Sequence, residues 1–347
     1  MHSFKRTLWK ALAFLLAVGA ATALITEPYF QNEGYHYQDD AVREQLAGEL
    51  DTLICGSSHA YYGIVPAVLD EKLGTNSYNL SAPMMTLQGR YELLKKELDR
   101  NPVDLVFVDV SFNTFSRDRA EEGPEGDIYQ LGRYRNVLER MSYLVRNIRF
   151  GEYARVYSDT LDRGVTVIRK LLRGEGKTGT SDKYETKGWM RGESIAQYMT
   201  PPEYYHTQVL DTTVRQENLD CMDKIIDLCR ERGITVVFVV TPISQSSTLR
   251  YDNMDAIHSS LTAYCTGQDV PLFDFNLYKG KTALYPDETA YYDASHLAEG
   301  AAQDFTALMC DTLLQWQAGE DVSGQFYASY AAAEEAALAG LDVPPVS

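Results

Sequence analysis

The sequence predicts an α/β protein, a three-layer α/β/α sandwich in which helices cover both faces of a central parallel sheet. Short apolar runs that suit strands alternate with longer stretches whose apolar residues recur at helical spacing. The run 105–110 is almost entirely β-branched or aromatic, which is typical of a strand covered on both faces. Such alternation of strands and helices favours parallel strand pairing.

The strands and helices follow one another in a regular order. Gly56 ends the first strand in a tight turn, and Gly74 and Gly233 stop two of the helices. We expect the strands at residues 53–55, 77–80, 105–110, 234–240 and 270–275. We expect the main helices at residues 66–73, 87–98, 219–229, 254–264 and 305–316.

The N-terminus carries a targeting signal. Lys5, Arg6 and Lys10 precede an uncharged, mostly apolar run at 11–25. The run is short for a span of about 20 residues, but two apolar residues before Lys10 lengthen it if that lysine snorkels. We therefore expect residues 1–27 to form an uncleaved membrane anchor, with the N-terminus in the cytoplasm and the rest of the chain outside.

Two other interpretations of this segment stay open. The triplet Ala21-Thr22-Ala23 resembles a signal-peptide cleavage site, and cleavage there would release a secreted protein. A buried core helix is the second alternative.

Beyond the anchor we expect one α/β domain at residues 28–318. Residues 116–210 interrupt the strand–helix alternation after the third strand, and we interpret them as a helical and loop insertion that covers or shapes a substrate cleft. Residues 319–347 are acidic and rich in alanine, and we expect them to form a separate tail.

Composition excludes several classes of function. The formal net charge of the 347-residue chain is −17 and its Lys and Arg are not clustered, which argues against nucleic-acid binding. The five cysteines have no CxxC spacing and no zinc-site pattern. No P-loop and no GxGxxG follows a strand, so we expect neither a metal nor a cofactor.

The tetrapeptide Gly56-Ser57-Ser58-His59 follows the first strand, at the sheet edge where open α/β sheets bind ligands. A turn from strand to helix exposes a hydroxyl there, beside free backbone N–H groups that can stabilise an oxyanion. We interpret Ser58 as a nucleophile whose own N–H helps to hold the oxyanion. The alternative is an ordinary serine helix cap.

A serine needs a base, and Asp293-Ala294-Ser295-His296 offers one. His296 can take the proton of the serine, and Asp293 can orient the imidazole if the segment forms a turn or the start of a helix. The alternative is a capped helix start with a surface histidine.

Two further segments offer oxyanion donors. Asn113 follows the third strand, and its side-chain amide can donate a hydrogen bond to an oxyanion. A turn or cap role for this asparagine is the alternative. Ser81 follows the second strand and offers its backbone N–H.

Taken together, these segments resemble the SGNH/GDSL hydrolase superfamily over roughly residues 50–115 and 218–316. The family pattern Gly-Asp-Ser reads Gly56-Ser57-Ser58 here, so Ser58 inherits the nucleophile's role. Ser57 replaces the family's aspartate, as in membrane-anchored branches similar to DltD, the D-alanyl-lipoteichoic-acid biosynthesis protein. Ser81 replaces the second-block glycine, and 111–114 replaces Gly-x-Asn-Asp.

The resemblance implies a flavodoxin-like sandwich and an activity. We expect an extracytoplasmic serine esterase or O-acyltransferase that uses Ser58, His296 and Asp293 on ester-linked acyl groups of a cell-surface glycan or polymer. The implied partners are that acylated polymer, the membrane and a membrane-bound acyltransferase. The alternative is an inactive protein of the same fold that binds a surface polysaccharide or a membrane acyltransferase.

Overall fold

A computed structural model describes residues 2–32, 42–117, 125–134, 136–175, 186–193, 199–342 and 344–345. The chain divides into two compact units. The helical unit comprises residues 1–41 and 123–182, and the α/β unit comprises residues 42–122 and 183–347.

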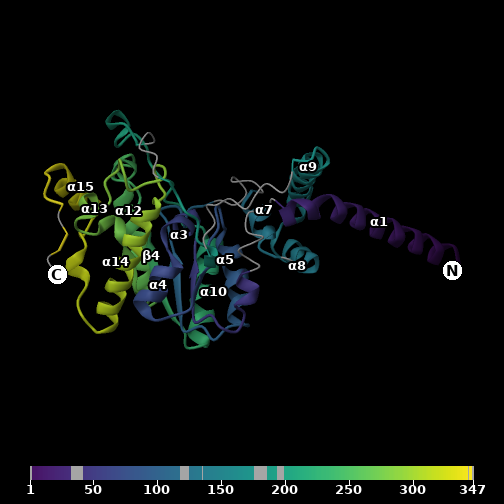
Figure 1. Ribbon diagram of the computed structural model, residues 1–347, viewed down its shortest axis with the longest axis horizontal. Helices are drawn as coiled ribbons and strands as arrows, with labels where there is room; N and C mark the ends of the chain where they lie inside the picture. Colours follow the sequence, from purple (N-terminus) through teal and green to yellow (C-terminus); the bar gives the residue numbers. More distant parts are fainter. Residues whose placement is uncertain are drawn as a thin grey trace. The chain divides into compact units, whose positions relative to one another are not determined.

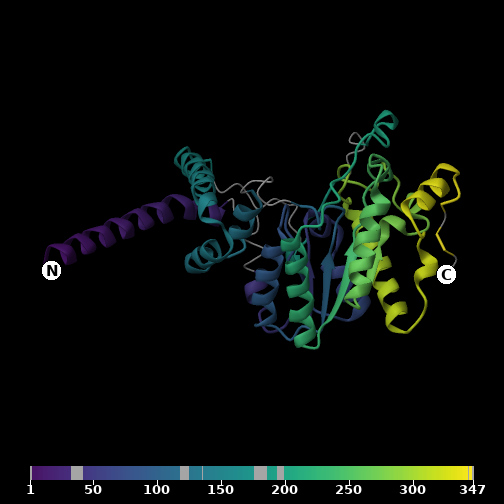
Figure 2. The same cartoon turned by 180° about the vertical axis from the view of Figure 1, so that it is seen from behind.

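The α/β unit is built on a five-stranded sheet in the order β2-β1-β3-β4-β5, and every neighbouring pair is parallel (Figures 1 and 2). This is the flavodoxin-like order, so the predicted fold class is confirmed. The strands are β1 (Thr52–Cys55), β2 (Ser77–Asn79), β3 (Leu105–Asp109), β4 (Thr235–Val240) and β5 (Leu272–Asp274).

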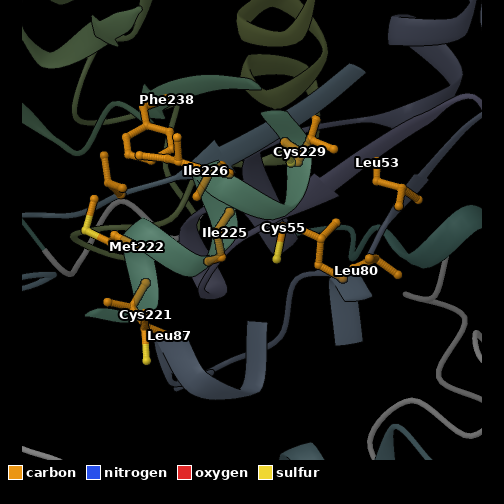
Figure 3. Close-up of a cluster of buried hydrophobic side chains, with 14 of the residues drawn as sticks. Leu53, Cys55, Leu80, Leu87, Cys221, Met222, Ile225, Ile226, Cys229 and Phe238 are labelled. Atoms are coloured by element: carbon orange, nitrogen blue, oxygen red, sulfur yellow. The ribbon is translucent and has the colours of Figure 1, made fainter. Parts of the chain in front are cut away.

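Alternate side chains of each strand enter two separate cores. Val106 and Val108 of β3 join one core, whereas Leu105 and Phe107 join the other. The first core is completed by α5 (Leu87–Leu98), α10 (Gln216–Glu231) and α12 (Met254–Gly267) (Figure 3). The second is completed by α3 (Ser58–Gly63), α4 (Pro66–Leu73) and α14 (Glu299–Gln317). Because both faces of the sheet are buried, the inner strands β3 and β4 are nearly continuous apolar runs.

Local signals set the helix ends in this unit. Pro66 opens α4, where its missing N–H is not needed, and Gly74 ends the helix in the left-handed conformation at φ 70°. The side chain of Thr86 caps α5 by accepting a hydrogen bond from the N–H of Gly89 at 3.1 Å. Two short helices complete the region around the sheet edge, α11 (Gln245–Leu249) and α13 (Lys281–Leu284).

The C-terminal segment packs on the α/β unit. It contains α15 (Tyr330–Leu338), whose Tyr330 hydroxyl donates to the buried carboxylate of Asp274 at the end of β5. Further along, Asp342 accepts hydrogen bonds from the N–H groups of Gly280 at 2.6 Å and Thr282 at 2.9 Å. These bonds hold the segment against the start of α13.

The helical unit consists of α1 (His2–Asn32), α7 (Glu125–Gly132), α8 (Val137–Asn147) and α9 (Tyr153–Leu172). The predicted apolar run 11–25 lies in the middle of α1. Residues 5–31 of this helix are long enough and apolar enough to cross a membrane. The predicted helical insertion after the third strand provides α7, α8 and α9, which pack with α1 around a small aromatic and aliphatic core.

Candidate active site

The turn after β1 requires glycine at position 56, because there is no space there for a side chain. A Cβ at Gly56 would lie 2.6 Å from the Cβ of Asp109 and 2.7 Å from the Cβ of Ala60. Such distances are well inside van der Waals contact. The glycine therefore lets the end of β1 approach the end of β3.

Ser57 is turned inward at this point. Its hydroxyl and its backbone N–H both donate to Asp109 Oδ2, at 2.9 and 3.3 Å, and its Oγ accepts from the N–H of His59 at 3.3 Å. The other carboxylate oxygen of Asp109 accepts from the Thr241 hydroxyl at 2.9 Å. Asp109 thus joins the ends of β1, β3 and β4, and Ser57 is its structural partner and the N-cap of α3.

Ser58, the next residue, faces the histidine that the sequence singled out. Ser58 Oγ lies 2.7 Å from His296 Nε2, and His296 Nδ1 lies 2.9 Å from each carboxylate oxygen of Asp293. Ser58 and His296 stand 238 positions apart in the chain. The three predicted catalytic side chains therefore form one continuous chain of hydrogen bonds.

The Asp293–His296 segment is a tight turn closed by backbone bonds. Tyr291 and Leu297 form an antiparallel bridge, and the N–H of Tyr292 donates to the carbonyl of His296 at 2.7 Å. Asp293 Oδ1 also accepts from the N–H groups of Ser295 at 2.8 Å and His296 at 3.0 Å. The aspartate is thus fixed by its own turn before it meets the imidazole.

A serine-rich turn after β4 forms hydrogen bonds to the loop that carries Asp293 and His296. The hydroxyls of Ser244 and Ser247 each donate to the carbonyl of Ala294 at 2.7 Å. Asp287 in turn accepts from the N–H groups of Gln245 at 2.7 Å and Ser246 at 2.8 Å, at the start of α11. No motif in the sequence pointed to these residues, although a cluster of three serines after a strand end is a visible signal.

The electrostatics of the site favour an ionised Asp293. Burial raises the pKa of this carboxyl, but the hydrogen bond and charge of His296, with the two backbone N–H donors, outweigh burial and lower the pKa to about 2. A carboxylate can only accept, so Nδ1 of His296 carries the proton toward Asp293. In the neutral imidazole Nε2 is then free to accept the proton of Ser58.

His59 lies next to the predicted catalytic side chains. Its ring is 5.2 Å from that of His296 and 6.4 Å from that of Phe112, centre to centre. Burial and the proximity of His296 lower the pKa of His59 to about 4, so the residue stays neutral near pH 7. A neutral His59 adds no competing positive charge beside the base.

The three predicted oxyanion donors differ in availability. Ser58 N–H and Asn113 Nδ2 have no hydrogen-bond acceptor within the described ranges of the chain, while Asn113 Oδ1 accepts from the Ser111 hydroxyl at 2.8 Å. The N–H of Ser81 instead donates to the side chain of Asn79 at 3.0 Å. The role of Ser81 as a donor stays a prediction that requires Asn79 to release it.

An aromatic group borders the site. Tyr62 stacks on Tyr292 with ring centres 5.4 Å apart, and it lies 5.1 Å from the ring of His296. The Trp189 indole N–H donates to the carbonyl of Tyr62 at 2.8 Å, and the N–H of Met190 donates to the carbonyl of Tyr61 at 3.0 Å. Residues 186–193 therefore pack against α3 at the edge of the site.

The described part of the chain contains no cluster of three His, Cys, Asp or Glu side chains arranged to hold a metal ion. All five cysteines lie within the described residues and are buried, and none of them forms a disulfide. The side chains that the described residues bring together at this site are the serine, histidine and carboxylate groups of Ser58, His296 and Asp293.

No family model and no curated protein matches this chain. Among solved structures, it is similar to a GDSL-like lipase from Bacteroides thetaiotaomicron, with 9% identity, a TM-score of 0.39, and coverage of 83% of this chain and 99% of that one. It is also similar to a "putative acylhydrolase" from Bacteroides fragilis, with 8% identity, a TM-score of 0.39, and coverage of 82% and 95%. At TM-scores this low, these similarities assign neither a family nor an activity to the chain.

Proposed function

We propose that this protein is a serine enzyme that transfers acyl groups from esters, with Ser58 as nucleophile, His296 as general base and acid, and Asp293 as the residue that orients His296. The observation that carries the proposal is the unbroken series of hydrogen bonds from Asp293 through His296 to Ser58. A serine hydroxyl becomes an effective nucleophile when a base in this arrangement takes its proton.

The reaction proceeds in two halves. Ser58 Oγ attacks the carbonyl carbon of the ester while its proton passes to His296 Nε2. The tetrahedral intermediate collapses, the leaving alkoxide takes that proton from His296, and the acyl group stays on Ser58 as a new ester. A water molecule or an acceptor hydroxyl then gives its proton to His296 and attacks the acyl group, and Ser58 recovers its proton.

The negative charge that develops on the carbonyl oxygen needs donors. Support for Ser58 N–H and Asn113 Nδ2 in this role comes from their freedom from other acceptors in the described ranges. Donors that are fixed before the reaction stabilise the oxyanion without further reorganisation. The ionised Asp293 also stabilises the imidazolium that forms on His296.

We further propose that α1 anchors the enzyme in a membrane and that the α/β unit acts outside the cytoplasm. Support comes from the length and apolar composition of α1, with Lys5, Arg6 and Lys10 at its beginning. The export signal and the DltD-like pattern at Gly56-Ser57-Ser58 favour an acylated surface glycan or polymer as substrate. The same residues serve an esterase when water is the acceptor and an O-acyltransferase when a polymer hydroxyl is the acceptor.

A second candidate function is binding without turnover. The engaged N–H of Ser81 favours it, because one of the three predicted oxyanion donors is occupied. In that case the site would hold a surface polysaccharide or a membrane acyltransferase without forming an acyl-enzyme.

A fluorophosphonate probe tests the proposal on the full-length protein in detergent. We expect a covalent adduct that maps to Ser58, is lost in Ser58→Ala and His296→Ala, and persists in the control Ser260→Ala. Incubation with acetyl and D-alanyl esters, with and without glycan acceptors, then separates hydrolysis from transfer. The proposal is wrong if the folded protein gives no adduct at Ser58 and no acyl-enzyme mass shift with either ester.

A further inference from the structure

The helix α8 exposes a stripe of large apolar side chains. Leu138 and Val145 are 73% and 67% exposed, and Val137 and Met141 are exposed beside them. These four positions recur at helical spacing, so they lie on one side of the helix. On its opposite side α8 buries Arg140 and Tyr143 within the helical unit. A continuous stripe of large apolar side chains is unusual on a helix surface that contacts only water.

The stripe opens into an apolar groove shared with α1 and α9. The groove has a volume of about 780 Å³ and lies between residues 18–30 of α1, the stripe on α8, and the first half of α9. Its walls are almost wholly carbon. Its volume and mostly apolar lining suit hydrocarbon chains. The polar side chains in the lining include Glu27 and Arg140, which form an ion pair, and Thr22 and Tyr157, whose hydroxyls bond each other.

The wall that α1 contributes is fixed to α9 by close backbone packing. A Cβ at Gly164 of α9 would lie 2.1 Å from the carbonyl oxygen of Ile25, so the two helices touch where only glycine fits. The hydroxyls of Thr22 and Tyr157 are hydrogen-bonded at 2.8 Å, and Arg140 of α8 forms an ion pair with Glu27. Helices α8 and α9 therefore stay beside this part of α1 wherever α1 is located.

The position of the groove along α1 sets its depth in a membrane. A span needs about 20 residues, so one that starts after Lys10 ends near residue 30. Residues 18–30 then lie in the half of the span that is remote from the basic N-terminal end. That half belongs to the outer leaflet under the orientation proposed above.

The charge of this region also suits a lipid surface. Residues 137–173 contain eight Lys and Arg against four Asp and Glu, in a chain whose net charge is −17. Two of the eight, Arg140 and Arg163, are ion-paired with Glu27 and Glu125, which lie outside this range, and a smaller basic excess remains. An excess of basic residues beside an apolar helix face is typical of helices that lie at a bilayer surface and attract anionic headgroups.

We propose that α8 and the adjoining side of α9 lie in the outer leaflet of the bilayer, with lipid acyl chains filling the groove between these helices and α1. This proposal rests on α1 as a membrane span, and it is independent of the chemistry at Ser58. It gives part of the insertion a role that the sequence analysis did not foresee, as a membrane platform built on the anchor.

Fluorescence quenching tests the location of α8, in nanodiscs that contain lipid but no other membrane protein. The full-length chain carries one introduced cysteine at a time, Leu138→Cys, Val145→Cys, Ser158→Cys or Leu12→Cys, labelled with a small fluorophore. The five native cysteines are buried, which directs labelling to the new thiol. The nanodiscs contain anionic lipid brominated near the headgroup end of the acyl chains, because interfacial helices sit about 5–10 Å into the boundary between headgroups and chains.

Ser158 is the matched control. It is exposed and does not line the groove, and within the part of the chain that the structure describes its hydroxyl bonds only the carbonyl of Arg155, at 3.0 Å. We expect brominated lipid to reduce the fluorescence of labels at Leu138 and Val145 and to leave the label at Ser158 unchanged.

Each other outcome overturns the proposal in a distinguishable way. If the label at Leu12 is quenched while the labels at Leu138 and Val145 behave like the label at Ser158, α1 is in the bilayer and α8 is not. That result would fit a groove that binds another membrane protein instead of lipid. If Leu12 is also unquenched, the anchor itself is wrong. Fluorophosphonate labelling of Ser58 on the same samples reports separately on the catalytic proposal.

Discussion

The hydroxyl of Ser57 donates to the buried carboxylate of Asp109 at 2.9 Å, while the hydroxyl of its neighbour Ser58 meets His296. Two adjacent serines thus have opposite orientations and different roles. Ser57 occupies the position of an aspartate in the resembling family, and here Asp109 supplies a carboxylate from the end of β3 instead. The turn that carries Ser58, the proposed nucleophile, is therefore held by a contact between strands.

Loss of the Asp109 carboxylate should destabilise the fold more than loss of the nucleophile. Asp109→Ala leaves the hydroxyls of Ser57 and Thr241 without their acceptor, and each buried unsatisfied group costs about 1–3 kcal/mol. Ser58→Ala removes a half-buried hydroxyl and should change the free energy of unfolding by less than about 0.5 kcal/mol. Urea denaturation measures both. Equal stability of the two variants would contradict the structural role of Asp109.

Gly56→Ala should impair both stability and labelling. The new methyl group would lie 2.6 Å from the Cβ of Asp109, so the turn that carries Ser58 must move. Gly300→Ala, in the first turn of α14, is the matched control, because a Cβ there meets no atom within 4 Å. The midpoint temperature of thermal denaturation and the rate of fluorophosphonate labelling should both fall in Gly56→Ala and stay near the wild-type values in Gly300→Ala. A normal labelling rate in Gly56→Ala would show that the turn tolerates the shift.

Asp293→Asn should slow acylation by orders of magnitude with little change in overall structure. The amide can donate to Nδ1, which favours the imidazole tautomer with its proton on Nε2, and that nitrogen can no longer accept from Ser58. Stopped-flow acylation with an activated ester measures the effect. Ser295→Ala, which removes a neighbouring hydroxyl from the same turn, should retain most of the rate.

The same carboxyl should contribute to acid sensitivity. The pKa of Asp293 in the folded protein is about 2, below the value of about 3.9 for an unfolded carboxyl. Its contribution is therefore fully present above about pH 4 and is lost as the pH falls toward 2. The stability advantage of the wild type over Asp293→Asn should shrink between pH 5 and pH 2, as measured by urea midpoints. The change should be small, since the side chain is 35% exposed.

Removal of the serines beneath the catalytic loop should affect rate without changing the pH profile. In the double variant Ser244→Ala, Ser247→Ala the carbonyl of Ala294 loses both side-chain donors, while the turn's own bonds still hold Asp293 against His296. We expect a lower acylation rate with an unchanged apparent pKa of the reaction. Ser246→Ala is the control, because its hydroxyl accepts from the N–H of Thr200 at 3.3 Å and reaches the loop only through Ser244 Oγ, 3.4 Å away. A shifted pH profile would mean that these serines act on the base itself.

Much of this protein was determined by local sequence pattern. All five strands lie within a residue or two of their predicted bounds, because strand and helix periodicity are properties of short segments. The approach of Ser58 to the Asp293–His296 turn also followed from sequence, since the carboxyl ends of parallel strands meet at one edge. The choice of Ser58 over Ser57 as the proposed nucleophile came in addition from the resemblance of Gly56-Ser57-Ser58 to the pattern Gly-Asp-Ser.

Tertiary structure decided what depends on contacts between distant segments. The inward bond of Ser57 to Asp109, the support of Ala294 by Ser244 and Ser247, and the capture of the Ser81 N–H by Asn79 depend on side-chain directions that no periodicity encodes. The association of the insertion helices with α1 is likewise invisible in sequence, since it depends on the backbone contact at Gly164. Local patterns fix where an element begins and ends, whereas only packing fixes which elements meet.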